Sequence, residues 1–125
     1  MIKKVFVIFL FSSLILMACS KTKVMNFTGE SENWYVDYEV KVFDENSEST
    51  HFTIKYKGKD PKPQKIKYNI EYGSGKTDGT DNLNNGELNL GGHSCSGCAV
   101  IQEDDVMEVT ITWNGELETF NLKNK

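Results

Sequence analysis

Apolar side chains recur at every second position in long stretches of this chain. One such row covers residues 34–42, and shorter rows cover residues 52–56 and 66–72. Strict alternation of apolar and polar residues is typical of β-strands that bury one face and expose the other. No segment after residue 19 shows a convincing helical period. The pattern therefore predicts an all-β protein.

The clearest local signal is the dipeptide Asn114-Gly115, which lies between two alternating runs. Asn followed by Gly readily adopts the positive φ values of a type I′ turn, the usual two-residue connection of a β-hairpin. Counting outward from this turn sets the register and places the apolar partners on one face. The predicted pairs are Trp113 with Glu116, Ile111 with Glu118, Val109 with Phe120, and Met107 with Leu122.

The rest of the chain divides into short strands and turn-rich connections. Leu88 and Leu90 indicate one more strand, and residues 99–101 a very short one. Turn-forming residues predominate in segments 44–49, 58–63, 73–86 and 91–97. Seven or eight amphipathic strands predict two sheets packed face to face, a β-sandwich of immunoglobulin-like or fibronectin-like type. The immunoglobulin signature of a Trp between two distant cysteines is missing.

The start of the chain has the pattern of an export signal. Lys3 and Lys4 precede an apolar run that is too short to span a bilayer, and the small residue Ala18 precedes Cys19. These features predict a secretory signal peptide that is removed after residue 18.

Residues 16–19, Leu-Met-Ala-Cys, resemble the lipobox of bacterial lipoproteins. The resemblance implies that cleavage leaves Cys19 as the new N-terminus and that its sulfur carries a diacylglyceryl thioether. A two-chain anchor holds a protein stably on a membrane, because each buried methylene adds about 0.8 kcal/mol of affinity. An ordinary signal-peptidase site with an incidental cysteine is the alternative.

The expected organisation is a cleaved signal peptide (1–18), a lipidated Cys19 with a polar tether (19–26), and one β-sandwich domain (27–125). The tether reaches roughly 25 Å at full extension, so the domain stays close to the extracytoplasmic face of the membrane. Removing residues 1–18 takes away two lysines and no acidic residue, which changes the net charge from −4 to −6. Such an acidic chain is a poor partner for nucleic acid.

A Cys-x-x-Cys motif, Cys95 and Cys98, follows His93. In an exported protein we favour a local disulfide, because residues i and i+3 of a turn bring their Cα atoms within the 4.4–6.8 Å that a disulfide requires. Three alternatives stay open. Thiol–disulfide exchange needs a thiol pKa lowered by a helix N-terminus or a cation. A zinc site would need His93 and His51 in addition, and the last alternative is a pair of free thiols.

Acidic and amide residues cluster between Asp78 and Glu87 and raise the possibility of a calcium loop. Their spacing does not match an EF-hand, because Leu83 stands where that loop needs Gly. Asx-rich turns explain the same composition. The chain contains no nucleophile, phosphate-binding or dinucleotide-binding motif, and most of its aromatic residues fall on the apolar rows of the core. We therefore expect neither an enzyme nor a bound cofactor.

Four motifs together resemble a set found in small uncharacterised lipoproteins of Bacillus-type Gram-positive bacteria. The motifs are residues 27–34 (FTGESENW), 56–60 (YKGKD), 95–98 (CSGC) and 113–115 (WNG). The resemblance implies a lipid-anchored location and a compact β domain, and it implies no activity.

The sequence thus predicts a lipid-anchored extracytoplasmic module that binds an envelope or wall-associated ligand and contacts the membrane through Cys19. One alternative is a thiol–disulfide or metal-handling lipoprotein that uses Cys95 and Cys98. A structural component of the envelope is another.

Overall fold

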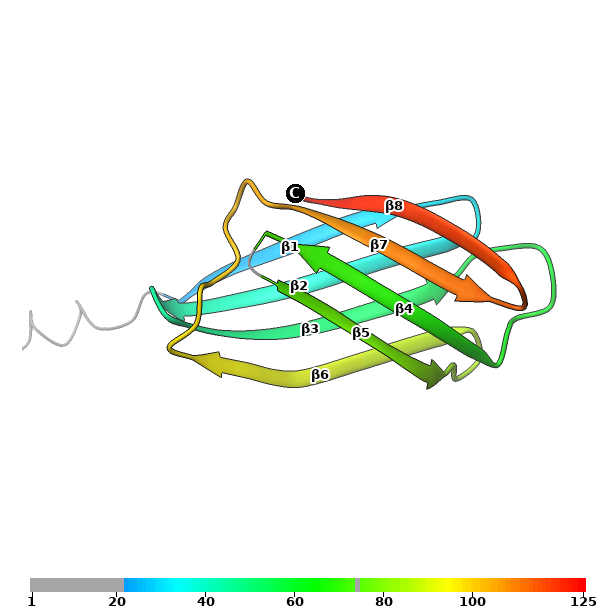
Figure 1. The fold of residues 1–125 in the computed structure, drawn as a ribbon, viewed down its shortest axis with the longest axis horizontal. Helices are drawn as coiled ribbons and strands as arrows, with labels where there is room; N and C mark the ends of the chain where they lie inside the picture. Colours follow the sequence, from blue (N-terminus) through cyan, green and yellow to red (C-terminus); the bar gives the residue numbers. More distant parts are fainter. Residues whose placement is uncertain (1–21, 74) are drawn as a thin grey trace, which may run out of the picture.

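The computed structural model describes residues 22–73 and 75–125, which form eight β-strands and no helix. The strands are β1 Lys23–Glu30, β2 Trp34–Asp44, β3 Ser47–Tyr56, β4 Lys65–Tyr72, β5 Gly75–Asn82, β6 Glu87–Ser96, β7 Val106–Trp113 and β8 Glu116–Asn124 (Figure 1). A membrane-spanning helix is therefore not found in these two ranges. The predicted signal peptide and Cys19 lie outside the described residues.

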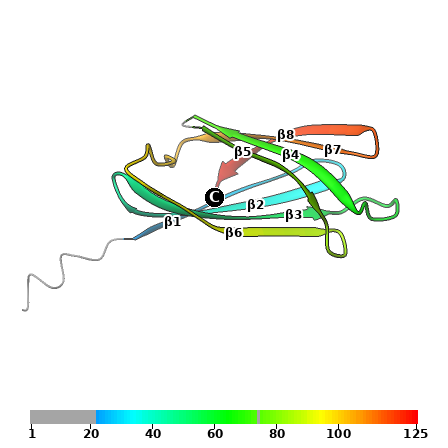
Figure 2. The same ribbon diagram turned by 60° about the horizontal axis from the view of Figure 1, so that its bottom comes forward.

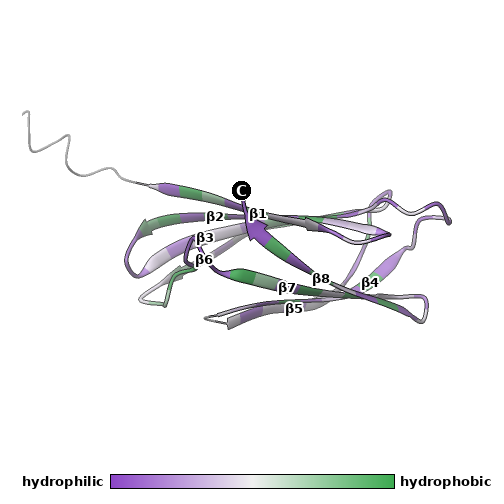
Figure 3. Ribbon diagram, turned by 90° about the horizontal axis from the view of Figure 1, so that it is seen from above, coloured by the Kyte–Doolittle hydropathy of each residue, from purple (hydrophilic) through white to green (hydrophobic). Residues whose placement is uncertain are grey.

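All eight strands belong to one antiparallel sheet with the order β5-β4-β7-β8-β1-β2-β3-β6. The sheet folds back on itself, so that one half (β1, β2, β3, β6) faces the other (β4, β5, β7, β8), as Figure 3 shows. The halves are joined where β8 pairs with β1 through Phe27 with Asn124 and Thr28 with Lys123. The sheet is thereby nearly closed into a barrel.

The predicted all-β class is confirmed, whereas the immunoglobulin-like or fibronectin-like sandwich is not. In such a sandwich two sheets are separate, but here hydrogen bonding continues from β8 to β1. Alternation in the sequence reports which face of each strand is buried. That information is the same for two stacked sheets and for one sheet folded over.

The strongest sequence signals lie where they were expected. The three alternating rows form most of β2, β3 and β4. The β7–β8 hairpin has all four predicted pairs, and its turn residues Asn114 and Gly115 have φ values of 46° and 78°. The predicted hairpin register is confirmed.

Three segments predicted as turns contain strand residues. Residues 73–86 contain β5, residues 91–97 contain the second half of β6, and residues 47–49 of segment 44–49 begin β3. Residues 99–101, predicted as a very short strand, lie in the loop between β6 and β7. β5 carries polar residues and glycine on both faces, so it shows no apolar alternation. It is a strand because it pairs with β4 along its whole length.

A β-bulge in β6 explains the second error. Thr50 pairs with His93 and Phe52 with Leu90, so Gly91 and Gly92 together oppose a single residue of β3. The extra residue shifts the alternation of β6 by one position. Positions 93 and 95 therefore continue the inner row of Leu90, and turn-like composition conceals a bulged strand.

The space between the two halves contains aliphatic side chains and a group of packed aromatic rings. Trp34 makes edge-to-face contacts with Tyr56 and Trp113, with ring centroids 5.1 and 5.3 Å apart. Tyr38 stacks on Phe52 with centroids 5.6 Å apart. These five side chains are buried, as their places on the apolar rows predicted.

The loop between β6 and β7 covers one end of the barrel. Its Ile101 is almost fully buried, and the Ile101 N–H donates to Oε2 of Glu48 over 2.9 Å. β1 begins at this end, and its Lys23 forms an ion pair with Glu103 of the same loop. We call this the tether end; Lys23 lies within the segment predicted as a tether. The opposite, turn end carries the β1–β2, β3–β4 and β7–β8 connections (Figure 1).

Candidate binding groove between two sheet edges

The two outermost strands of the sheet, β5 and β6, border the gap in the barrel and form no ladder with each other. Over the described chain, β5 pairs only with β4 and β6 only with β3. Residues 83–86 connect the two strands, and a single bridge between Asn84 and Glu87 closes this turn. The strands then diverge toward the tether end (Figure 1 and Figure 2). The bulge at Gly91 and Gly92 bends β6 in the region where they separate.

A cavity of about 410 Å³ lies between these edges, and we call it the seam groove. Its lining residues are Thr50, Phe52, Tyr68, Lys76, Thr77, Asp78, Leu90, Gly91 and His93. Lys76 to Asp78 belong to one edge and Leu90 to His93 to the other. The groove therefore exists because β5 and β6 do not pair with each other.

Aromatic side chains form the floor of the groove. Phe52 packs edge-to-face on Tyr68 at 5.5 Å and is stacked on Tyr38. The Tyr38 hydroxyl is 3.5 Å from Oγ1 of Thr77 and so links β2 to β5 across the interior. Burial raises the pKa of Tyr38, which keeps this hydroxyl protonated and able to donate.

Tyr68 binds β5 through a hydrogen bond on the inner face of the sheet. Its hydroxyl donates to Oδ2 of Asp81 over 3.0 Å. Burial, followed by the hydrogen bond and charge of Asp81, raises the pKa of Tyr68 to about 12. The ring passes close to Gly79, where an added Cβ would lie 2.6 Å from the hydroxyl oxygen. Glycine at this position lets the strand approach the aromatic floor.

A smaller cavity of about 160 Å³ continues the groove toward the tether end. It shares Thr50 and His93 with the seam groove, and its other lining residues are Glu48, Tyr72, Cys95, Cys98 and Ala99. Glu48 is buried although its side chain ends in a carboxyl group, and this group accepts a hydrogen bond from the Ile101 N–H. The sequence interpretation placed Glu48 in a turn, yet extending the row of Phe52 and Thr50 backward by two residues would have found it on the inner face.

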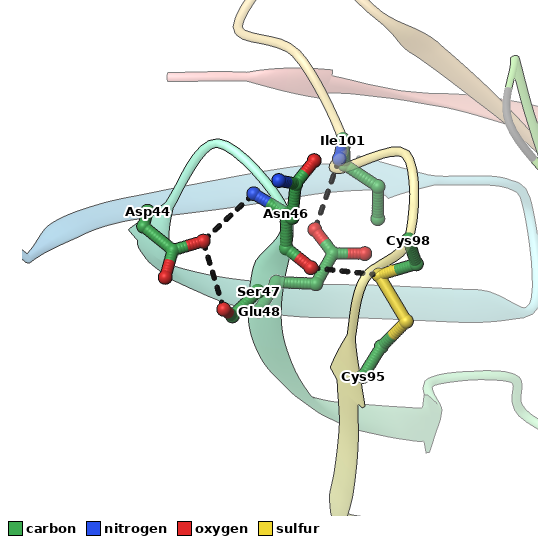
Figure 4. The surroundings of a disulfide bond; sticks show 7 residues. All are labelled: Asp44, Asn46, Ser47, Glu48, Cys95, Cys98 and Ile101. Carbon is green, nitrogen blue, oxygen red and sulfur yellow. Dashed lines mark hydrogen bonds between the residues drawn. A yellow bond between two sulfur atoms is a disulfide. The ribbon is translucent and has the colours of Figure 1, made fainter.

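The structure joins Cys95 and Cys98 by a disulfide whose Cα atoms are 6.1 Å apart, beside the small cavity (Figure 4). The Cys98 N–H donates to the carbonyl oxygen of Asn46 over 3.0 Å, which fastens the loop to the β2–β3 turn. Asp44 stabilises that turn by accepting from the Asn46 N–H and the Ser47 hydroxyl at 2.7 and 2.8 Å. These hydrogen bonds lower the pKa of Asp44.

The positions of the neighbouring side chains do not favour a zinc site or thiol–disulfide exchange at this motif. His93 pairs with the inward Thr50, whereas His51 is the next residue of β3 and faces outward, against Gly91. The two histidines thus lie on opposite faces of the sheet. Within residues 22–73 and 75–125, no three His, Cys, Asp or Glu side chains gather as metal ligands would. A loop, rather than a helix, follows Cys98.

The residues considered for a calcium loop are spread along β5, the turn and the start of β6. Asp78 is exposed beside Lys76, at 3.7 Å, whereas Asp81 points inward and accepts from Tyr68. Asp78 and Asp81 are three positions apart in one strand and so face opposite sides. The structure does not bring these carboxylates together.

A second concave region, of about 660 Å³, lies at the turn end. Three of the four sequence motifs meet there, through Asn33, Lys57 to Asp60, and Trp113. Glu118 holds these segments together: its Oε1 accepts from the Ser31 hydroxyl (2.5 Å) and the Asn33 N–H (3.1 Å), and its Oε2 from the Asn33 side-chain amide (2.5 Å). Partial burial opposes ionisation of Glu118, but these hydrogen bonds outweigh it and lower the pKa of Glu118. Because both oxygens of this carboxylate accept hydrogen bonds from the β1–β2 turn, we assign it a structural role at the turn end.

Comparison of the chain with protein-family models, with curated proteins and with solved structures finds no match.

Proposed function

We propose that this protein is a lipid-anchored, extracytoplasmic binding module that holds its ligand in the seam groove. The observation that carries this proposal is the cavity of about 410 Å³ between two unpaired sheet edges. Binding sites are typically concave, with a largely apolar surface and a few polar groups that orient the ligand. Phe52, Tyr68 and Leu90 supply the apolar surface, and Thr77 and His93 supply polar groups at the rim.

The position of β1 supports an anchor close to the domain. Lys23 begins β1 only four residues after Cys19, which allows a span of about 14 Å at full extension. Val24 and Phe43, two large apolar side chains that are about half exposed, lie on β1 and β2 at the same end. The tether end therefore faces the membrane when Cys19 carries lipid, and the seam opens toward that end.

A cavity-filling variant tests the binding site. The protein for this test is the chain from residue 19 with Cys19→Ser, which cannot carry the proposed lipid. It keeps the core that the structure describes, since the buried apolar residues of ranges 22–73 and 75–125 lie between Met25 and Leu122. The probe is anilinonaphthalene sulfonate, whose fluorescence rises on apolar aromatic surfaces. Thr77→Trp fills the groove, and Thr80→Trp places the same ring on the exposed face of β5 as the matched control.

We expect saturable binding of about one dye per chain, lost in Thr77→Trp and retained in Thr80→Trp. Circular dichroism verifies that both variants keep the strand content of the parent chain. Equal dye binding by all three chains, or no binding by any of them, would contradict a ligand site in the seam groove.

A further inference from the structure

We infer that the ligand of the seam groove is an extended polypeptide segment, which pairs with the free edges of β5 and β6 as an additional strand. This inference rests on the proposed function of the groove and names the chemical class of its ligand.

The walls of the groove are backbone edges. An unpaired strand presents a row of N–H and C=O groups at the spacing of a β-ladder, and another polypeptide backbone repeats that pattern of donors and acceptors. Addition of a strand to an exposed sheet edge is an established mode of peptide recognition. Here two such edges line one cavity. A single inserted segment would therefore fill the gap between β5 and β6 in the sheet.

The direction of the inserted segment follows from the topology. Neighbouring strands are antiparallel throughout the row of eight, so the first strand, β5, and the last, β6, run in opposite directions. A segment between them forms an antiparallel ladder with one edge and a parallel ladder with the other. The bulge at Gly91 and Gly92 lies on β6, the strand that borders one side of the gap, and bends it locally.

The floor of the groove specifies the side chains of the segment. Alternate side chains of an extended peptide point to opposite sides. One set therefore contacts Phe52, Tyr68 and Leu90, which favours apolar residues at every second position. The other set faces solvent beside Lys76 and Asp78, an oppositely charged pair that favours polar residues of neither sign in particular.

The edges are unsuited to indiscriminate pairing. β5 has charged side chains and two glycines, features that limit edge-to-edge association between folded proteins. A flexible segment that lies in the groove gains the aromatic floor as well as the backbone bonds. The groove therefore favours an extended peptide over the edge of a second folded chain.

Selection from a displayed library of random ten-residue peptides provides the probe. The library is selected on the mature chain with Cys19→Ser, after depletion on the Thr77→Trp variant. The enriched peptide is then synthesised in two forms, one unmodified and one N-methylated at two alternate central residues. N-methylation removes backbone donors and keeps every side chain. A third peptide, N-methylated only at its terminal residue, is the matched control.

We expect enriched sequences with apolar residues at alternate positions. The centrally methylated peptide should bind about tenfold more weakly or worse, as the loss of one or two backbone hydrogen bonds predicts, and the control should not. Hydrogen exchange of the complex should slow at amides of β5 and β6 and leave those of the β7–β8 hairpin unchanged.

Two other results would overturn the inference. Dye binding in the groove without any peptide that discriminates against Thr77→Trp would retain the binding function and reject a polypeptide ligand. Concentration-dependent dimerisation that protects the β5 and β6 amides without peptide would assign the edges to a second copy of the chain. Failure of both dye and peptide to bind would reject the proposed function itself.

Discussion

Single side chains fix the loops at the two ends of this barrel by hydrogen bonds to distant strands. Glu118 is the clearest case, because one carboxylate accepts hydrogen bonds from a hydroxyl, a backbone N–H and a side-chain amide of the β1–β2 turn. The β1–β2 turn is thereby joined to β8, which is distant in sequence. Neither Ser31 nor Asn33 carries a sequence pattern that names Glu118 as a partner, since their contact depends on the fold.

The lowered pKa of Glu118 predicts a pH-dependent contribution to stability. A carboxylate whose pKa is lower in the folded state stabilises the fold above its unfolded pKa of about 4.3, and this contribution disappears as pH falls through the folded pKa. Glu118→Gln should lower the free energy of unfolding by about 1–2 kcal/mol at pH 7. The Gln side chain has an NH₂ group in place of one carboxylate oxygen, and this group cannot accept a hydrogen bond from the side-chain amide of Asn33.

Urea unfolding at pH 7 and at pH 3 measures this difference. The gap between Glu118→Gln and the parent chain should narrow at the lower pH. Glu116→Gln, an exposed substitution on the same strand, is the control and should unfold as the parent does. An equal gap at both values would show that Glu118 acts without its charge.

Gly91 predicts a specific steric coupling across the bulge. A Cβ built at Gly91 would lie 2.5 Å from Cδ2 of His51, so Gly91→Ala must displace the imidazole. We expect a loss of about 1 kcal/mol in the free energy of unfolding, within the usual range for overpacking. His51→Ala alone should have little effect, because this side chain is exposed. The double variant should recover most of the loss.

Denaturant unfolding of the four chains forms a double-mutant cycle. A Gly91→Ala chain as stable as the parent, or a double variant no better than Gly91→Ala, would exclude this contact.

At the level of elements, the local patterns predict some strands well and others poorly. The β7–β8 hairpin is predictable because Asn114-Gly115 sets the turn and apolar residues alternate on both sides of it. β5 is not, because its polar residues satisfy no periodicity and only pairing with β4 makes it extended. The seam groove depends on β5 and on the bulge of β6, and the sequence pattern predicts turns at both places. The groove therefore cannot be predicted from the sequence.

The loop between β6 and β7 supports a prediction about its disulfide. Residues 95 and 98 close a very small ring, so in the chain-entropy model the bridge adds only about 2 kcal/mol or less. Hydrogen bonds from Cys98 to Asn46 and from Ile101 to Glu48 hold the same loop independently. Replacing both cysteines with Ser should leave the fold intact.

Circular dichroism and urea unfolding of the Cys95→Ser, Cys98→Ser double variant check this prediction. The parent chain should also fail to reduce insulin at a useful rate. Rapid insulin reduction that Cys95→Ser abolishes would support thiol–disulfide exchange instead, and zinc bound in equal amount to protein and lost with either cysteine would support metal handling.

On the scale of the whole molecule, the two ends of the barrel have different roles. At the turn end, hydrogen bonds of Glu118 hold the β1–β2 turn against β8, whereas β1 begins at the tether end, four residues after Cys19. Because the seam widens toward the tether end, an anchored domain would bind its ligand close to the membrane (Figure 1). The acidic chain disfavours attraction to anionic headgroups, so the proposed attachment to the membrane would depend on a lipid carried by Cys19.

This reasoning predicts that attachment depends on Cys19 alone among the three cysteines. A Cys19→Ser chain expressed in a Gram-positive host should be released into the medium or stay unprocessed, because it lacks the sulfur that would carry the diacylglyceryl group. A Cys98→Ser chain is the matched control and should remain with the membrane, since its cysteine lies in the folded domain. Cell fractionation followed by intact-mass measurement distinguishes the lipidated, unprocessed and released forms. Normal processing and membrane retention of Cys19→Ser would show that the domain attaches through its own surface.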